Sequence, residues 1–245
     1  MVNVLRKQPV ATVRDTAALE IFRHQWQLYR KFLTHDYLSN AGAYVELHRL
    51  LTDELARPYD FLDLACGDAS GIVTALRGTP IAHYCGIDLA PPALELAKDN
   101  LGELPCPVTL EQTDFVTAMQ DEARTADIVW IGLSLHHLGT ADKLNLMREI
   151  RERIGDCGAL LIYEPTRWDG EDRTSYLDRF ETIARRDWTE LSADERDDAL
   201  RHVRTCDLPE TRTQWCALGR EAGFTRVAER YTSGDDLFRM FSYQP

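Results

Sequence analysis

Three aspartates, each at or near the end of a short apolar segment, are the residues of this sequence best suited to bind a ligand. Asp63 lies in LDLACGDASG, Asp88 in YCGIDLAPP and Asp114 in LEQTDF. In an open α/β sheet, ligands bind beyond the carboxyl ends of the strands, so side chains at successive strand ends meet at one site. Acids in this order suit an ammonium group, two ribose hydroxyls and an adenine amino group. The spacing therefore predicts a ligand that contains an amino acid, a ribose and an adenine.

The loop after Asp63 has the small residues that a close approach of backbone to ligand requires. These are Ala65, Gly67 and Ala69, and Gly67 adopts a positive φ at no steric cost. The N–H groups of the helix that follows favour a carboxylate or a phosphate. The loop lacks the GxGxxG pattern of dinucleotide-binding loops and begins with an acid, which weighs against an NAD-dependent oxidoreductase.

The elements that must position these residues alternate along the chain. Apolar runs predict strands at 61–64, 84–87, 108–112, 127–133 and 159–163, with helical patterns between them and two closing strands at 224–231 and 237–243. Strands that are nearly continuous apolar runs, alternating with helices, indicate a parallel sheet covered on both faces. The sequence thus predicts an α/β fold, namely a doubly wound, mostly parallel seven-stranded sheet with helices on both faces.

Two helical regions flank or interrupt this pattern. Residues 1–57 are expected to form an N-terminal helical cap, with a stripe at Leu19, Phe22, Trp26, Tyr29 and Leu33. Residues 169–207 are expected to be a helical insertion after the fifth strand, in which SADE at 192–195 is a capping box. Residues 58–168 and 208–245 then form the ligand-binding domain, and the insertion is placed to act as a lid.

The segments LDLACGDASG, YCGIDLAPPALELAKDN and LEQTDF resemble the three cofactor motifs of the class I S-adenosylmethionine-dependent methyltransferases. Ala65 and Ala69 stand where the usual first motif has glycine. The resemblance implies S-adenosyl-L-methionine as cofactor and S-adenosyl-L-homocysteine as product. It also implies cofactor contacts from Asp63, Ala65, Cys66, Gly67, Asp88, Leu89, Asp114, Phe115 and Leu133, with Tyr29 and Arg30 as candidates near the carboxylate end.

Residues for the acceptor side follow the fourth and fifth strands. His136 or His137 is a candidate general base because an imidazole is largely neutral at physiological pH. Alternatively, the pair is pocket wall or helix cap, and catalysis rests on alignment alone. Expected substrate contacts are Glu164, Arg167, Trp168 and Tyr37. Glu164 has the alternative of capping a helix or pairing with Arg167.

Composition narrows the class of partner. Against 28 Lys and Arg stand 40 Asp and Glu, a net charge of −12, so nucleic acid and anionic membranes are poor partners. Six cysteines without CxxC spacing predict reduced thiols and no metal site. No apolar run approaches the length of a membrane helix and the first residues lack a signal-peptide core, so a cytoplasmic protein is expected.

The sequence therefore predicts an enzyme that moves a methyl group from S-adenosylmethionine to a small-molecule acceptor by in-line displacement. Two alternatives stay open: a module that binds S-adenosylmethionine or S-adenosylhomocysteine without transfer, and a methyltransferase that acts on a protein. The sequence specifies neither the acceptor atom nor the oligomeric state.

Overall fold

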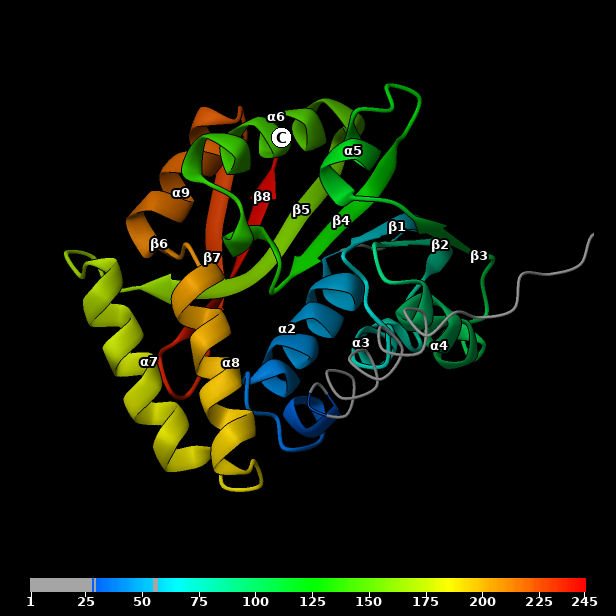
Figure 1. Cartoon of the computed structure of the whole chain (residues 1–245). Coiled ribbons are helices and arrows are strands. Elements are labelled where there is room, and N and C mark those ends of the chain that lie inside the picture. The colour runs from blue at the N-terminus through cyan, green and yellow to red at the C-terminus, as the bar shows by residue number, and fades with distance from the viewer. Residues whose placement is uncertain (1–27, 29, 55–56) are drawn as a thin grey trace, which may run out of the picture.

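The computed structural model describes residues 28, 30–54 and 57–245. Its centre is a sheet with the strand order β3-β2-β1-β4-β5-β8-β7 (Figure 1). The strands are β1 (Tyr59–Leu64), β2 (Ile81–Asp88), β3 (Val108–Gln112), β4 (Ala126–Gly132), β5 (Ile154–Arg167), β7 (Arg226–Thr232) and β8 (Phe238–Gln244). A two-residue strand, β6 (Glu210–Thr211), pairs with the end of β5. The predicted α/β sheet is confirmed, and β5 is longer than predicted because three strands pair along it.

The strand order reverses at β1, which lies between β2 and β4 and is parallel to both. Among the strands of this order, β8 alone runs in the opposite direction: it is antiparallel to β5 on one side and to β7 on the other. Ligands bind α/β sheets where the order reverses, because the helices on either side diverge there and leave a crevice. The fold therefore directs attention to the carboxyl end of β1.

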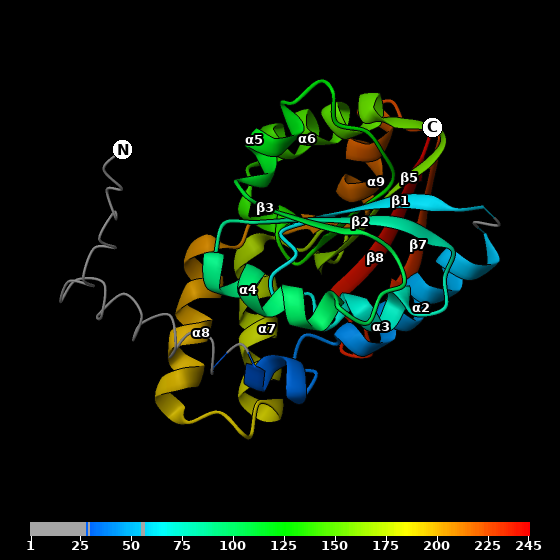
Figure 2. The same ribbon diagram turned by 90° about the vertical axis from the view of Figure 1, so that its right-hand side faces the viewer.

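Helices cover both faces of the sheet, as predicted. Figure 2 shows α2 (Asn40–Asp53), α3 (Ile72–Leu76) and α4 (Pro91–Leu101) on one face, and α5 (Phe115–Met119), α6 (Thr140–Arg153) and α9 (Arg212–Glu221) on the other. Alternation along β1 divides its side chains between two cores: Phe61 packs with the first set of helices, and Leu62 and Leu64 with the second.

The insertion at 169–207 forms α7 (Arg173–Asp187) and α8 (Ala193–Cys206). The two helices lie side by side (Figure 1). The predicted capping box is present, with the Ser192 hydroxyl accepting from the Glu195 backbone N–H. One stripe of the insertion is buried in the main core: Tyr176, Leu177, Phe180, Ala184 and Trp188. The insertion is therefore packed onto the sheet domain.

Only part of the predicted N-terminal cap falls within the described residues. The stripe positions Leu19, Phe22, Trp26 and Tyr29 lie outside them. The α2 helix buries Leu47, Leu50 and Leu51 against the sheet domain. Within the part of the chain that the structure describes, no helix is long and apolar enough to cross a membrane.

Candidate active site

The loop after β1 has a backbone conformation that glycine adopts freely and other residues adopt at a cost. Ala65, Gly67 and Ala69 have φ values of 64°, 56° and 56°. The alanines therefore hold left-handed conformations, each costing about 1–2 kcal/mol. The N–H of Gly67 donates to Oδ2 of Asp88 at 2.8 Å, and the N–H of Ala90 donates to Oδ1 at 2.8 Å. Asp88, at the end of β2, thus ties the loop to the neighbouring strand.

Asp63 is a buried carboxyl at the end of β1, with 2% of its surface exposed. The Tyr84 hydroxyl donates to its Oδ2 at 2.7 Å. Burial raises the pKa of Asp63 to about 7; the Tyr84 hydrogen bond opposes this shift and the nearby Asp88 adds to it. A ligand ammonium at this position would stabilise the ionised form, because an adjacent positive charge offsets the cost of burial.

A cavity of about 290 Å³ lies beside this loop. The predicted cofactor residues on its wall are Asp63, Ala65, Cys66, Gly67, Asp88 and Leu133. The structure thus brings together six residues from the ends of three strands. The other wall is largely apolar and comes from α2, β4 and β5, with the segment before α2: Leu38, Asn40, Tyr44, Trp130 and Tyr163. Sequence reasoning did not select these five.

Two of those five were accessible in principle from the strand pattern. Trp130 is the register partner of Asp63 across β1 and β4, and Tyr163 is the partner of Gly132 across β4 and β5. Once the register is known, a large aromatic residue near the carboxyl end of a strand can be predicted to line a pocket at that edge of the sheet. No signal in the sequence placed Leu38, Asn40 or Tyr44 at the cavity, because helix packing decides their position.

Three predicted cofactor residues do not line the cavity. Leu89 is 63% exposed just beyond β2. Asp114 accepts a hydrogen bond from the Thr117 backbone N–H at 3.0 Å and so caps α5. Phe115 is half-buried against the core beneath α5 and α6. All three residues lie just beyond the ends of β2 and β3. Because they do not line the cavity, their adenine-binding role stays a prediction.

Glu164 is fully buried and acts as the cap that sequence reasoning kept as an alternative. Its Oε1 accepts from the backbone N–H groups of Ser134 at 3.1 Å and Leu135 at 2.9 Å. Its Oε2 lies 2.6 Å from Nδ1 of His136. Glu164 therefore fixes the start of the short 3₁₀ helix η1 (Leu135–His137) and pairs with His136 instead of Arg167.

The two histidines of η1 have opposite pKa shifts. Burial alone lowers the pKa of His136, but the Glu164 and Asp207 carboxylates outweigh it and the net shift is upward. Burial and the neighbouring His136 lower the pKa of His137 to about 4. Neither ring is among the side chains that line the cavity.

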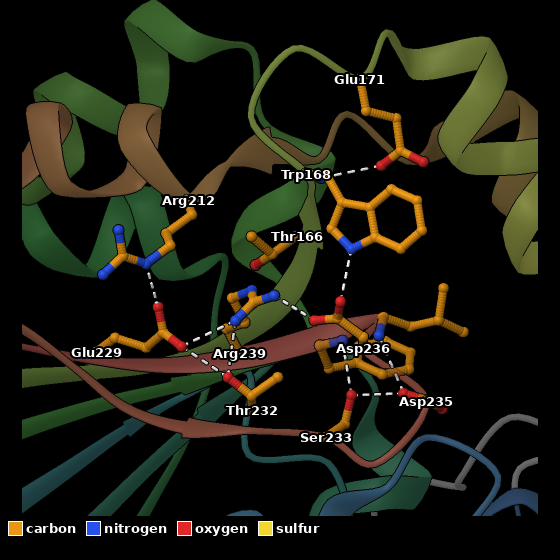
Figure 3. Close-up of polar contacts among 12 residues, drawn as sticks. Thr166, Trp168, Glu171, Arg212, Glu229, Thr232, Ser233, Asp235, Asp236 and Arg239 are labelled. Atoms are coloured by element: carbon orange, nitrogen blue, oxygen red, sulfur yellow. Dashed lines mark hydrogen bonds and ion pairs between the residues drawn. The ribbon is translucent and has the colours of Figure 1, made fainter.

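Three residues predicted to contact the substrate instead form hydrogen bonds between segments of the protein near the insertion. Arg167 donates to the Pro209 carbonyl at 2.8 Å and to the Gln214 side chain at 2.9 Å. The Trp168 indole donates to Asp236 at 2.6 Å (Figure 3). The Tyr37 hydroxyl accepts from the Glu190 backbone N–H at 2.9 Å. None of the three lines the cavity.

The two residues proposed for the carboxylate end of the cofactor come from the N-terminal region. Tyr29 lies outside the described residues, and Arg30 is exposed on the helical turn before α2. Their predicted role near the cofactor carboxylate stays a prediction.

Gly71 is required by the packing of the cavity wall, since a Cβ at this position would lie 2.5 Å from the Tyr44 ring. We expect Gly71→Ala to destabilise the protein by about 1–3 kcal/mol through overpacking, measured by urea unfolding. Tyr44→Ala in the same chain should recover part of that loss. Gly155→Ala is the matched control, because a Cβ there meets no atom within 4 Å. Equal effects of the two glycine substitutions would contradict this account.

The comparisons with known proteins agree with this geometry. Residues 61–158 match a family model described as a methyltransferase domain. The chain is 24% identical over 173 residues to a carboxy-S-adenosyl-L-methionine synthase of Actinobacillus pleuropneumoniae serotype 5b (strain L20), covering 67% of this chain and 68% of that protein.

Two solved structures share the fold. An O-methyltransferase family protein from Burkholderia thailandensis matches with a TM-score of 0.61 at 18% identity, over 87% of this chain and 59% of that one. Human N-acetylserotonin methyltransferase, in complex with S-adenosylmethionine, matches with a TM-score of 0.60 at 16% identity, over 89% of this chain and 55% of that one. The chain thus spans less than two thirds of the length of these two structures.

A doubly wound sheet with a ligand crevice at the end of β1, together with this family match, defines a class I methyltransferase domain. Residues 61–158 thus match a methyltransferase domain within a fold shared with S-adenosylmethionine-dependent methyltransferases, which supports S-adenosylmethionine as the cofactor.

Proposed function

We propose that the protein transfers the methyl group of S-adenosylmethionine to a small-molecule acceptor. The observation that carries the proposal is the cavity of about 290 Å³, in which strand-end carboxylates face an apolar and aromatic wall. Ligand pockets in proteins combine apolar surface with a few placed polar groups, and begin at about this size.

The residues of the cavity have distinct roles in this proposal. Asp63 binds the ammonium group of the cofactor, the backbone from Ala65 to Gly67 follows its methionine part, and Asp88 binds the ribose. Leu133, whose φ is 54°, borders the sulfonium. The adenine extends along the ends of β2 and β3, where Leu89, Asp114 and Phe115 lie.

The reaction is a displacement at the methyl carbon. A lone pair of the acceptor forms the new bond to carbon, and the electrons of the sulfur–carbon bond go to sulfur, leaving S-adenosylhomocysteine. The sulfonium is already a good leaving group, so the protein chiefly aligns the acceptor, which supplies about 7–11 kcal/mol of the barrier in well-oriented systems. A proton-transfer role for His136 or His137 stays a prediction, and neither ring lines the cavity.

The insertion at 169–207 is proposed as a cover over the acceptor side, and the N-terminal helices as a second wall. The contacts that join these regions include an ion pair and a ring contact. The Lys31 ammonium lies 2.7 Å from Glu195 of α8, and Phe32 contacts Trp188 edge to face with ring centroids 4.7 Å apart. A cytoplasmic location stays a prediction.

The alternatives differ in a measurable way. A module that only binds the cofactor forms no product, and a protein methyltransferase labels a polypeptide. Because the chain is similar to a carboxy-S-adenosyl-L-methionine synthase, the test must also ask whether the cofactor sulfonium loses its methyl group or is itself modified. Mass spectrometry of reaction mixtures distinguishes S-adenosylhomocysteine from a modified sulfonium compound.

Calorimetric titration tests the cofactor site. We expect binding of S-adenosylmethionine and S-adenosylhomocysteine, and none of NAD. Asp88→Ala should weaken binding by about 1.5–3 kcal/mol, the range for hydrogen bonds to a charged group, because the ribose and the Gly67 N–H both lose an acceptor. Asp99→Ala is the matched control, since it removes an equal charge from the exposed side of α4. Absence of heat with both sulfur ligands would overturn the proposal.

A further inference from the structure

Outside the cavity, two histidines and an aspartate meet where η1 approaches the end of α8. Nε2 of His136 lies 3.5 Å from Oδ1 of Asp207, and Nδ1 of His137 lies 3.7 Å from the same oxygen. One ligand atom from each residue falls within 4.8 Å of the other two. Asp207 follows α8 directly as its C-cap, so the cluster joins the insertion to the segment after β4.

The hydrogen bonding of His136 decides what its second nitrogen offers. Nδ1 of His136 faces Oε2 of Glu164 at 2.6 Å, so it carries the proton and donates. In the neutral ring, Nε2 is then a lone-pair acceptor directed toward Asp207, whose carboxylate is also an acceptor. Two acceptors facing each other across 3.5 Å repel unless a cation lies between them or the ring takes a second proton.

The burial of Asp207 strengthens the case for a cation. Its side chain is 7% exposed, and its Oδ1 has no hydrogen-bond partner among the described residues. An unsatisfied buried acceptor costs about 1–3 kcal/mol, and more when it is charged. Glu164 on the other side of His136 is fully buried as well. The nearby Lys143 is already paired with Glu210 at 2.9 Å. A single ion bound between the two residues would satisfy both Nε2 of His136 and Oδ1 of Asp207.

The geometry and the donor set fit one class of ion. Zinc binds imidazole nitrogens and carboxylate oxygens at about 2.0–2.2 Å in a tetrahedron, which places neighbouring ligand atoms roughly 3.3 Å apart. The observed separations of 3.5 and 3.7 Å between Asp207 and the two rings need a contraction of a few tenths of an ångström. The two histidine nitrogens lie within 4.8 Å of each other and must approach further. The contact of Glu164 with the far nitrogen of His136 matches the way metal-binding histidines are held, by a carboxylate on the other ring nitrogen.

We propose that His136, His137 and Asp207 bind a zinc ion, with Glu164 orienting His136. His137 is 40% exposed, so the ion is reached from solvent and its fourth position is open to water. The site is separate from the cofactor cavity and does not depend on methyl transfer. A zinc ion bound to both imidazoles would exclude the proton-transfer role predicted for His136 or His137. It fastens the end of α8 to η1, which begins two residues after Leu133 on the cavity wall.

Cobalt titration of the chelator-stripped full chain tests the site without reference to activity. We expect one Co²⁺ per chain, with the strong visible absorption of four-coordinate cobalt, and displacement of the cobalt by Zn²⁺. A near-ultraviolet thiolate band should be absent, because the site holds no cysteine. His137→Ala and Asp207→Asn should each weaken Co²⁺ binding at least ~10-fold, the smallest loss usual when a group supporting a metal site is removed.

His83→Ala is the matched control and should bind Co²⁺ like the parent chain, because His83 lies on β2 beside Thr109. Circular dichroism confirms that each variant is folded, and the exposure of His137 makes His137→Ala the safer of the two. Absence of one-to-one binding, a thiolate band, or unchanged affinity in both site variants would each overturn the proposal.

Discussion

Asp63→Asn is expected to make the ligand-free protein more stable while weakening its hold on the cofactor. The pKa of Asp63 is raised to about 7, chiefly by burial, so the ionised form is costly in the folded state. Asparagine has the same shape, can still accept from the Tyr84 hydroxyl, and carries no charge. At pH 8 the variant should gain about 2–4 kcal/mol, since one pKa unit corresponds to about 1.4 kcal/mol.

The pH dependence follows from the direction of the shift. The folded protein binds the Asp63 proton more tightly than the unfolded chain, whose carboxyl has its ordinary pKa near 3.8. Stability of the parent chain therefore falls as the pH rises from about 4 to 7 and levels off above that. The difference between variant and parent should be near zero at pH 4 and largest at pH 8, measured by urea unfolding in both buffers.

Binding should change in the opposite direction. Loss of the charged partner for the cofactor ammonium should weaken S-adenosylhomocysteine about ten- to a hundred-fold, equivalent to 1.5–3 kcal/mol. Asp60→Asn is the matched control, because Asp60 is exposed on the same strand. A variant that is less stable than the parent at pH 8, or that keeps full affinity, would show that Asp63 is a structural residue and not a binding group.

Glu164→Gln is expected to cost about 3–5 kcal/mol of folding free energy, because several buried donors lose their acceptor and each unsatisfied group costs about 1–3 kcal/mol. The carboxylate accepts from three consecutive backbone N–H groups, those of Ser134, Leu135 and His136, and pairs with the His136 ring. The amide of glutamine replaces one acceptor oxygen with a donor that faces other donors. Equilibrium urea unfolding at neutral pH measures the loss.

Two further variants calibrate this result. Glu164→Asp keeps the charge on a shorter side chain and should fall between the parent and Glu164→Gln. Glu221→Gln removes an acid that is 62% exposed and lies 3.4 Å from Arg148, and should change stability by less than about 0.5 kcal/mol. If Glu164→Gln were as mild as Glu221→Gln, the cap on η1 would contribute little to folding.

The placement of the insertion shows what a local pattern leaves open. The stripe that includes Tyr176, Phe180 and Trp188 predicted a helix with one apolar face, and that helix exists. What this face packs against was not predictable from spacing. The Tyr176 hydroxyl donates to the Leu237 carbonyl at 3.2 Å in the β7–β8 turn, and Phe180 contacts Phe238 edge to face. Such contacts join segments far apart in the chain.

The sequence by itself determined the alternation of strands and helices and the position of Asp63 and Asp88 at strand ends. It also determined the unusual loop between them. These features depend on period-two burial, turn chemistry and chain order, which are local. The left-handed φ values of Ala65 and Ala69 occur where the methyltransferase motif has glycine.

Only the tertiary structure decided which side chains complete the cavity and what Glu164 does. Trp130 and Tyr163 reach the cavity through strand register, and Tyr44 reaches it through the packing of α2. Glu164 is an acid at a strand end in sequence, as Asp63 is. The two acids differ in their partners. Three backbone N–H groups at the start of η1, those of residues 134–136, donate to Glu164, whereas Asp63 lies on the cavity wall and accepts from Tyr84. Residue type and position at a strand end are alike for both acids and do not distinguish them. Their different roles follow from the residues, distant in sequence, that each acid contacts in the folded chain.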